Sequence, residues 1–324
     1  PGHVFQRSAR GHRRGAATQF KSGSQGKHHA ALRGGKFRGY QGGMNTTSPN
    51  AAPRFDSNQA WQDASSAVSA NRDVLIALAG VFIVLPAFAL AVRNPPPEPP
   101  SGADLDAVLE LLGTYFKAAW PGYLLVGLIN TVGTMAILAL FGHAGRPTVG
   151  QAITQGLTTT PIAIVVQIVQ GFLLAGAIML PSAILGLSGS PGLAALGILV
   201  GVAGAIYLAV RLCLANAVIA IEGLRNPIAA LQRSFTLTRA NVGRLLVFFV
   251  LLVLAFAISI QLIQLVIGLL AELLAGGEAA KMIGALTGAI LSAVMTVFLL
   301  GATAASYRQL VGSATQQSLV DKFN

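Results

Sequence analysis

The apolar stretches of this 324-residue chain contain few side chains that could do chemistry, and Arg211 is the most unusual of them. It lies ten residues before Glu222, about 15 Å along a helix, which can place it deep in a membrane. A guanidinium at mid-depth costs about 2.5–3.5 kcal/mol on insertion scales, so it requires a partner or water. Glutamines in other apolar runs could be that partner: Gln167, Gln170, Gln261 and Gln264.

Two interpretations of this polar set remain open. In the first, Arg211 and the glutamines form an intramembrane site for an anion or a lipid headgroup, or line the route of a small solute. In the second, the crossing segment ends near residue 210, so that Arg211 reaches the inner headgroups. The glutamines then hydrogen-bond between helices, which contributes about 0.6 kcal/mol each.

Side chains suited to catalysis or metal binding are scarce. Beyond residue 43 the chain has one histidine, His143, and its one cysteine is Cys213. It contains no H-E-x-x-H motif and no Cys/His ligand spacing, and no sequence pattern pairs its serines with a base. Within the apolar runs carboxylates occur only at the ends, at Glu222 and Glu272, so a carboxylate proton relay is not indicated. We expect no enzymatic activity, no cofactor and no metal.

The composition is typical of an integral membrane protein. Charged residues make up 10% of the chain, against about 25% in soluble domains, and the mean hydropathy is +0.65. Six apolar runs reach the roughly 20 residues that a helix needs to cross a bilayer. The sequence therefore predicts an all-α, polytopic transmembrane helical bundle. The predicted crossings are 74–92, with Pro86 inside it, 121–141, 161–187, 192–221, 245–271 and 282–304.

The distribution of Lys and Arg favours one orientation of this bundle. The connection 222–244 holds four arginines and one acid, whereas the connection 272–281 holds two acids and one lysine. By the positive-inside rule 222–244 faces the cytoplasm, which puts both termini on the same side. We expect a multi-pass protein of a bacterial inner membrane with cytoplasmic termini.

Composition also divides the chain into three parts. Residues 1–43 hold nine of the 22 basic residues and no acid, so we expect either a basic disordered tail or an upstream segment that the native protein lacks. A nucleic-acid-binding arm is a further interpretation of such a segment, but nucleic acid is not an expected partner. Residues 44–72 are predicted to be a cytoplasmic juxtamembrane segment, and 73–324 the six-span membrane domain.

Two segments outside the crossings have the pattern of amphipathic helices. In 58–71, Trp61, Ala64 and Val68 share one stripe, and Trp61 suits the membrane interface. In 104–117 the apolar residues also fall on one face. We expect a helix that lies on the outer membrane surface or one that packs on the bundle.

A third amphipathic helix is predicted within 225–244, where Asn226 can cap and Pro227 fits the first helical position. Eighty residues upstream, 147–158 has proline, leucine and threonine at the corresponding positions. The same shift superimposes the second crossing on the fourth and the third on the fifth. We therefore predict an internal duplication in which each copy is a span, an in-plane cytoplasmic helix and a second span.

The run from Glu222 to Thr238 resembles the motif of YciC-type inner-membrane proteins. It is equally similar to the membrane domain fused to some glycerophosphoryl diester phosphodiesterases, over residues 100–310. The phosphodiesterase's catalytic barrel has no counterpart in this sequence, so the resemblance does not imply its activity. The matching residues are Glu222, Pro227, Arg233, Ser234, Leu237 and Thr238.

The resemblance implies a helical inner-membrane protein of poorly defined role that is linked to envelope maintenance. Together with the scarcity of catalytic side chains, it predicts a non-enzymatic protein that acts through membrane lipids or membrane-protein partners. The alternative is a transporter or channel for a small solute with a site near Arg211.

Overall fold

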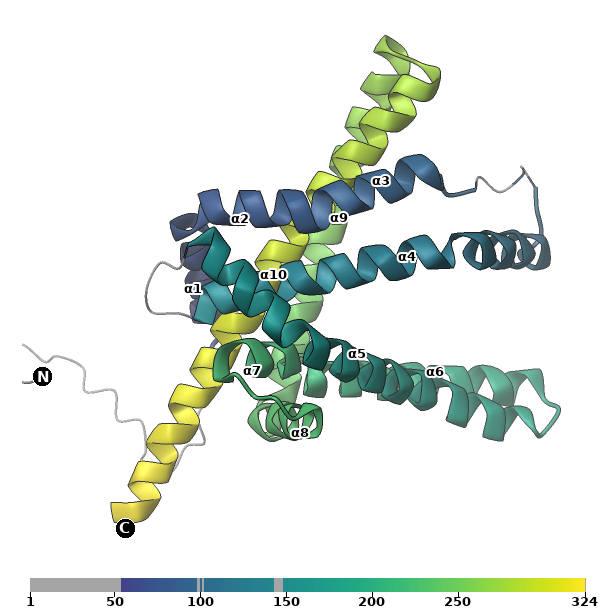
Figure 1. Cartoon of the computed structure of the whole chain (residues 1–324). Helices are drawn as coiled ribbons and strands as arrows, with labels where there is room; N and C mark the ends of the chain where they lie inside the picture. Colours follow the sequence, from purple (N-terminus) through teal and green to yellow (C-terminus); the bar gives the residue numbers. More distant parts are fainter. Residues whose placement is uncertain (1–53, 98–99, 101, 143–147, 324) are drawn as a thin grey trace, which may run out of the picture. The chain divides into compact units, whose positions relative to one another are not determined.

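The computed structural model describes residues 54–97, 100, 102–142 and 148–323. All regular elements within these ranges are helices, which confirms the all-α prediction (Figure 1). The predicted segment 1–43 and His143 lie outside the described residues. The helices are α1 (Ser57–Ala70), α2 (Arg72–Ala79), α3 (Leu85–Arg93), α4 (Leu105–Gly142), α5 (Val149–Gly186), α6 (Pro191–Leu212), α7 (Ala215–Glu222), α8 (Pro227–Thr238), α9 (Val242–Leu274) and α10 (Gly277–Phe323), with a π-helical segment, η1 (Gly80–Val84), between α2 and α3.

Six helical stretches in the described part of the chain are long and apolar enough to cross a membrane. They coincide with the six predicted crossings, so the prediction of a six-span bundle is confirmed. Their bounds are Arg72–Arg93, Leu105–Gly142, Val149–Gly186, Pro191–Glu222, Val242–Leu274 and Gly277–Gly312.

The first crossing departs from α-helical geometry immediately before Pro86. Proline has no N–H group to donate to the carbonyl four residues earlier. The backbone widens at η1, where the Leu85 N–H bonds to the Gly80 carbonyl five residues earlier. A single π turn therefore accommodates this proline inside the span.

Two of the predicted amphipathic helices are not separate elements. The predicted helix 104–117 is the first part of α4, which continues through Pro121. The predicted helix 147–158 is the first part of α5, which continues through Pro161. At 147–158 the prediction of a separate in-plane helix is wrong, whereas at 104–117 the helix packs on the bundle, one of the two predicted alternatives. The two halves of the predicted duplication also differ, because α5 is one helix where the other half has α8 and α9.

Tertiary contacts explain why neither proline ends its helix. Gly156 of α5 lies so close to α4 that an added Cβ would be 2.9 Å from the Ala136 nitrogen, so the start of α5 packs on α4. On α4, the hydroxyls of Tyr115 and Tyr123 lie 3.1 Å apart across Pro121. Tyr115 also donates to the Asn94 carbonyl at 2.9 Å, which holds the first part of α4 beside the end of α3.

The predicted helix 58–71 is present as α1, and its apolar stripe faces α10. Ala64 is fully buried, and a Cβ at Gly301 of α10 would lie 3.4 Å from Val68 and 3.6 Å from Ala64. Trp61 stacks on Phe298 of α10 with the ring centroids 5.6 Å apart. The juxtamembrane helix is therefore packed on the bundle.

Helices α5 and α6 approach so closely that their contact requires glycine. A Cβ at Gly201 would lie 2.8 Å from backbone atoms of Ile178, whereas a Cβ at Gly204, one turn later, would meet nothing within 4 Å. These two positions on one helix therefore offer a matched test of the packing.

We predict that Gly201→Ala lowers the free energy of unfolding by about 1–2 kcal/mol, because the overpacking cost exceeds the gain in helix propensity. Gly204→Ala should leave it unchanged or raise it by about 0.5–1 kcal/mol. Unfolding by SDS titration in mixed micelles, followed by circular dichroism, measures both. Equal effects of the two substitutions would contradict the described packing.

Candidate functional site

The predicted motif folds against a break in the fourth crossing. Helix α6 ends at Leu212 and α7 begins three residues later, so the last carbonyls of α6 lose their helical partners. Ser234 and Thr238 of α8 donate their hydroxyls to the Arg211 carbonyl at 2.9 and 3.3 Å. Gln170 of α5 donates to the Leu212 carbonyl at 2.9 Å. Side chains from two neighbouring helices thus replace the backbone bonds lost at the break.

Helix α7 is enclosed by the bundle. It contacts α4, α5, α8 and α10, and its residues from Ala217 to Ala220 have no exposed surface. Gln155 of α5 donates to the Ala220 carbonyl at 3.1 Å, near the other end of α7. The interrupted part of the fourth crossing is therefore surrounded by protein.

Helix α8 begins at Pro227, as its sequence predicts, and ends at Thr238. The chain turns after α7 at Gly223, whose φ of +68° favours glycine. The Asn226 side chain accepts the N–H groups of Ile228 and Ala229, and Pro227 is the first helical residue. Helix α8 buries Leu237 with Ser234 and Thr238 and exposes Ile228, so the prediction of a separate amphipathic helix is confirmed here.

Arg211 lies between two aromatic rings at the end of α6. Its guanidinium carbon is 3.6 Å from the ring centroid of Phe235 on α8 and 5.8 Å from that of Tyr207. The residue is 5% exposed, and its Nε atom has no hydrogen-bond partner among the described residues. The charge is therefore stabilised by ring faces, which contribute most where water is excluded.

Two of the four predicted glutamines lie on α5, and one of them, Gln170, reaches the end of α6. Gln170 bonds to the carbonyl of Leu212, the residue after Arg211. Gln167 lies one turn earlier on α5 and accepts the hydroxyl of Thr131 at 3.3 Å. The hydrogen bonds of Gln170 and Gln167 thus connect neighbouring helices. The burial of Arg211 does not fit the expectation that it reaches the headgroups.

The other two glutamines lie far along α9. The Arg211 carbonyl accepts a hydrogen bond from Thr238, which lies four residues before α9 begins. Gln264 lies about 33 Å along α9 from the first residue of that helix. The Gln264 amide is 3.5 Å from the Gly284 carbonyl of α10, and Gln261 is exposed. The five predicted residues therefore do not form one site.

A second polar cluster joins α7, α8 and α10. Glu222 accepts the hydroxyl of Tyr307 at 2.5 Å and the Nε–H of Arg233 at 3.2 Å. Tyr307 is 4% exposed, and its bond to a carboxylate belongs to the stronger class of hydrogen bonds. The Arg233 side chain is 40% exposed, so this ion pair contributes at most about 1 kcal/mol.

The residue after Tyr307 extends the cluster to α4. Arg308 donates to the Phe141 carbonyl at 2.9 Å, near the end of α4, where the last carbonyls lack helical partners. Sequence reasoning placed Glu222 and Arg233 in the motif but missed their connection to Tyr307. The two partners are 85 residues apart, and the Tyr-Arg pair after the last crossing was the available clue.

The described side chains do not form a metal centre, because no group of three or more His, Cys, Asp or Glu residues among them could hold an ion. Cavities of about 450 and 400 Å³ lie beside α1, and Arg211 lines neither of them. The site thus defines a polytopic helical membrane protein whose motif residues connect helices.

Comparison of the chain with protein families, with curated proteins and with solved structures finds no match. The resemblance to YciC-type proteins therefore stays a prediction.

We predict that Gln170→Leu lowers the free energy of unfolding by about 1–2 kcal/mol, since it leaves the Leu212 carbonyl unbonded in an apolar setting. Gln261→Leu makes the same chemical change at an exposed position of α9 and should cost less than 0.5 kcal/mol. SDS titration of both variants tests the role of the break. If Gln261→Leu lowers the free energy of unfolding as much as Gln170→Leu does, the hydrogen bond to the Leu212 carbonyl has no special role in stability.

A hydroxyl deletion tests the Glu222 cluster separately. Tyr307→Phe should destabilise the protein by about 1–3 kcal/mol, because the partly buried Glu222 carboxylate loses a hydrogen bond from a buried hydroxyl and keeps only Arg233 as a donor. Tyr207→Phe keeps the ring beside Arg211 and should change stability by less than 0.5 kcal/mol. Thermal unfolding midpoints of the two variants in one detergent give the comparison, and equal midpoints would argue against the cluster.

Proposed function

We propose that this chain is a non-enzymatic integral membrane protein of a bacterial inner membrane that acts in envelope maintenance through lipid or protein contacts. One observation supports this proposal above the others: the polar residues of the motif are bonded within the protein. Ser234 and Thr238 bond to the Arg211 carbonyl, and Glu222 bonds to Tyr307. Side chains engaged in this way stabilise helix packing and are not free to meet a substrate.

The surface of the described bundle fits partners that are themselves apolar. Large hydrophobic side chains on the crossings are strongly exposed, such as Phe172 on α5 at 76% and Leu265 on α9 at 69%. Lipid chains or apolar faces of other membrane proteins can cover such residues. We further propose that α8 lies on the cytoplasmic side, because the connection around it carries four arginines and one acid.

One observation favours a transporter as the second candidate. Arg211 is buried beside a broken helix with its Nε atom unpartnered, and discontinuous helices form the substrate sites of many transporters. Water would then reach Arg211 along the face of α6 that holds Gly204 and Tyr207. The two candidates therefore differ in whether this face is wet.

Cysteine labelling distinguishes the candidates. In a Cys213→Ala background, Gly204→Cys places a thiol where an added Cβ meets no atom within 4 Å. Gln232→Cys, on the exposed side of α8, is the matched control. We expect a membrane-impermeant maleimide to label residue 232 in inverted vesicles but not in intact cells, and to leave residue 204 unlabelled in both.

Rapid labelling at residue 204 would establish a water-filled path past Arg211 and replace the proposal by the transporter. Labelling at residue 232 in intact cells would overturn the proposed orientation. Because the two readouts are independent, function and topology are tested separately.

A further inference from the structure

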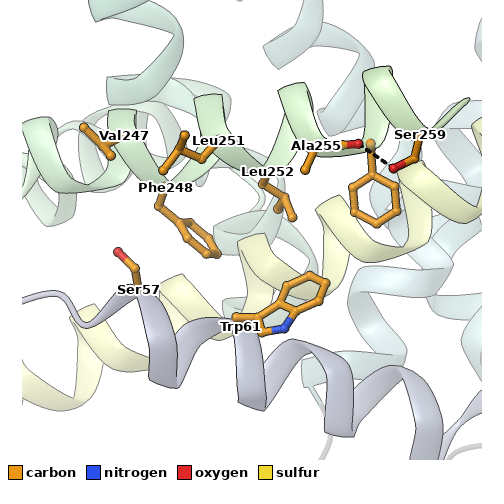
Figure 2. A pocket seen from close by; sticks show the side chains of 9 residues that line it. Ser57, Trp61, Val247, Phe248, Leu251, Leu252, Ala255 and Ser259 are labelled. Carbon is orange, nitrogen blue, oxygen red and sulfur yellow. Dashed lines mark hydrogen bonds between the residues drawn. The ribbon is translucent and has the colours of Figure 1, made fainter. Parts of the chain in front are cut away.

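A groove of about 450 Å³ runs between α1 and α9. Figure 2 shows Phe248 and Leu252 pointing from α9 towards α1, with Ser57 and Trp61 on the facing side. Apart from two serines, the lining is apolar, and the Ser259 hydroxyl is engaged with the Ala255 carbonyl. The lining residues are Ser57, Trp61, Val247, Phe248, Leu251, Leu252, Ala255, Phe256 and Ser259.

The groove exists because α1 packs mainly on α10 and meets α9 closely at one end. There Phe55 contacts Phe248 edge to face, with the ring centroids 5.5 Å apart. Farther along, Phe298 of α10 contacts both Trp61 and Phe256, at centroid distances of 5.6 and 5.5 Å. These aromatic contacts hold the walls of the groove in place.

The dimensions of the groove match one acyl chain. From Val247 to Ser259 the lining follows α9 for about 18 Å. One leaflet of a bilayer contributes about 15 Å of hydrocarbon, half of the roughly 30 Å core. The groove also opens to the surface, since Val247 is 57% and Leu251 is 59% exposed. A lipid chain that lies along α9 would cover both residues.

The charge at one end of the groove indicates the headgroup. Arg244 lies one turn before Val247 on the same face of α9, and Arg54 lies three residues before Ser57. Both arginines are exposed. The acid at this end, Asp56, accepts two backbone N–H groups at the start of α1. Two free cations beside one bonded carboxylate favour an anionic ligand.

We infer that the α1–α9 groove binds one acyl chain of an anionic phospholipid, whose phosphate group lies beside Arg54 and Arg244. The inference rests on the proposed function and deepens it, because it names the lipid class and the surface that binds it. By the proposed orientation, the lipid belongs to the inner leaflet. Bound there, it would join the juxtamembrane helix α1 to the crossing α9.

Tryptophan quenching tests the inference directly. The chain has two tryptophans, so Trp120→Phe leaves Trp61 as the single reporter in the groove. The full-length variant is reconstituted with phosphatidylglycerol or phosphatidylcholine whose acyl chains are brominated. We expect phosphatidylglycerol to quench Trp61 at a roughly 25-fold lower mole fraction than phosphatidylcholine, about fivefold for each of the two arginines.

Matched substitutions test separately how the arginine charges and the apolar groove contribute to the lipid preference. Arg54→Gln and Arg244→Gln should each lower the lipid preference about fivefold, whereas Arg225→Gln, in the turn before α8, should leave it unchanged. Ala255→Phe fills the groove and should abolish the preference. Ala257→Phe, an exposed position of α9 outside the groove, should preserve it.

Two results would overturn the inference. Equal quenching by the two lipids shows that no anionic lipid is selected. An absence of quenching by either lipid shows that a protein segment or a second copy covers Trp61. Either result, with residue 204 still closed to the maleimide, rejects the lipid site and leaves the proposed function standing. Labelling at residue 204 rejects the proposed function independently of the quenching.

Discussion

The carbonyl groups left open between α6 and α7 are the constraint on which much of the described structure depends. In an apolar bundle an unbonded carbonyl is destabilising, by about 1–3 kcal/mol, so donors must come from neighbouring helices. Ser234 and Thr238 bring α8 onto this break, and Gln170 brings α5. Once α8 lies there, the ring of Phe235 covers the Arg211 guanidinium. The position of the Arg211 side chain therefore follows from the hydrogen bonds that α8 makes to the open carbonyl.

Hydrogen bonds next to this break also join the motif to α10 and α4. Helix α7 is enclosed, and its last residue, Glu222, bonds to Tyr307 on α10, while Arg308 bonds to the end of α4. Helices distant in sequence thus converge on one polar region, where side chains serve packing. The apolar faces of the crossings are exposed, and the groove beside Trp61 lies among them.

Hydropathy and helical periodicity were sufficient to predict the six crossings, and cap residues predicted α8. The break after Leu212 was not predicted, because the residues there include no proline or glycine and the interruption is stabilised by α5 and α8. Continuity of α5 through Pro161 was missed for the related reason that Gly156 packs on α4. Among the site residues, the sequence indicated the buried Arg211. It could not assign Gln170 to the Leu212 carbonyl or Tyr307 to Glu222, since these contacts depend on tertiary structure.

Hydrogen–deuterium exchange of the α7 amides measures the central constraint most directly. In the unmodified protein these amides should exchange slowly, because α7 is enclosed and its flanking break is bonded. The double variant Ser234→Ala/Thr238→Val removes both donors to the Arg211 carbonyl and should raise exchange in α7 at least tenfold, while α1 stays unchanged. Exchange in α7 that is fast in the unmodified protein, or that is unaltered in the double variant, would contradict the account.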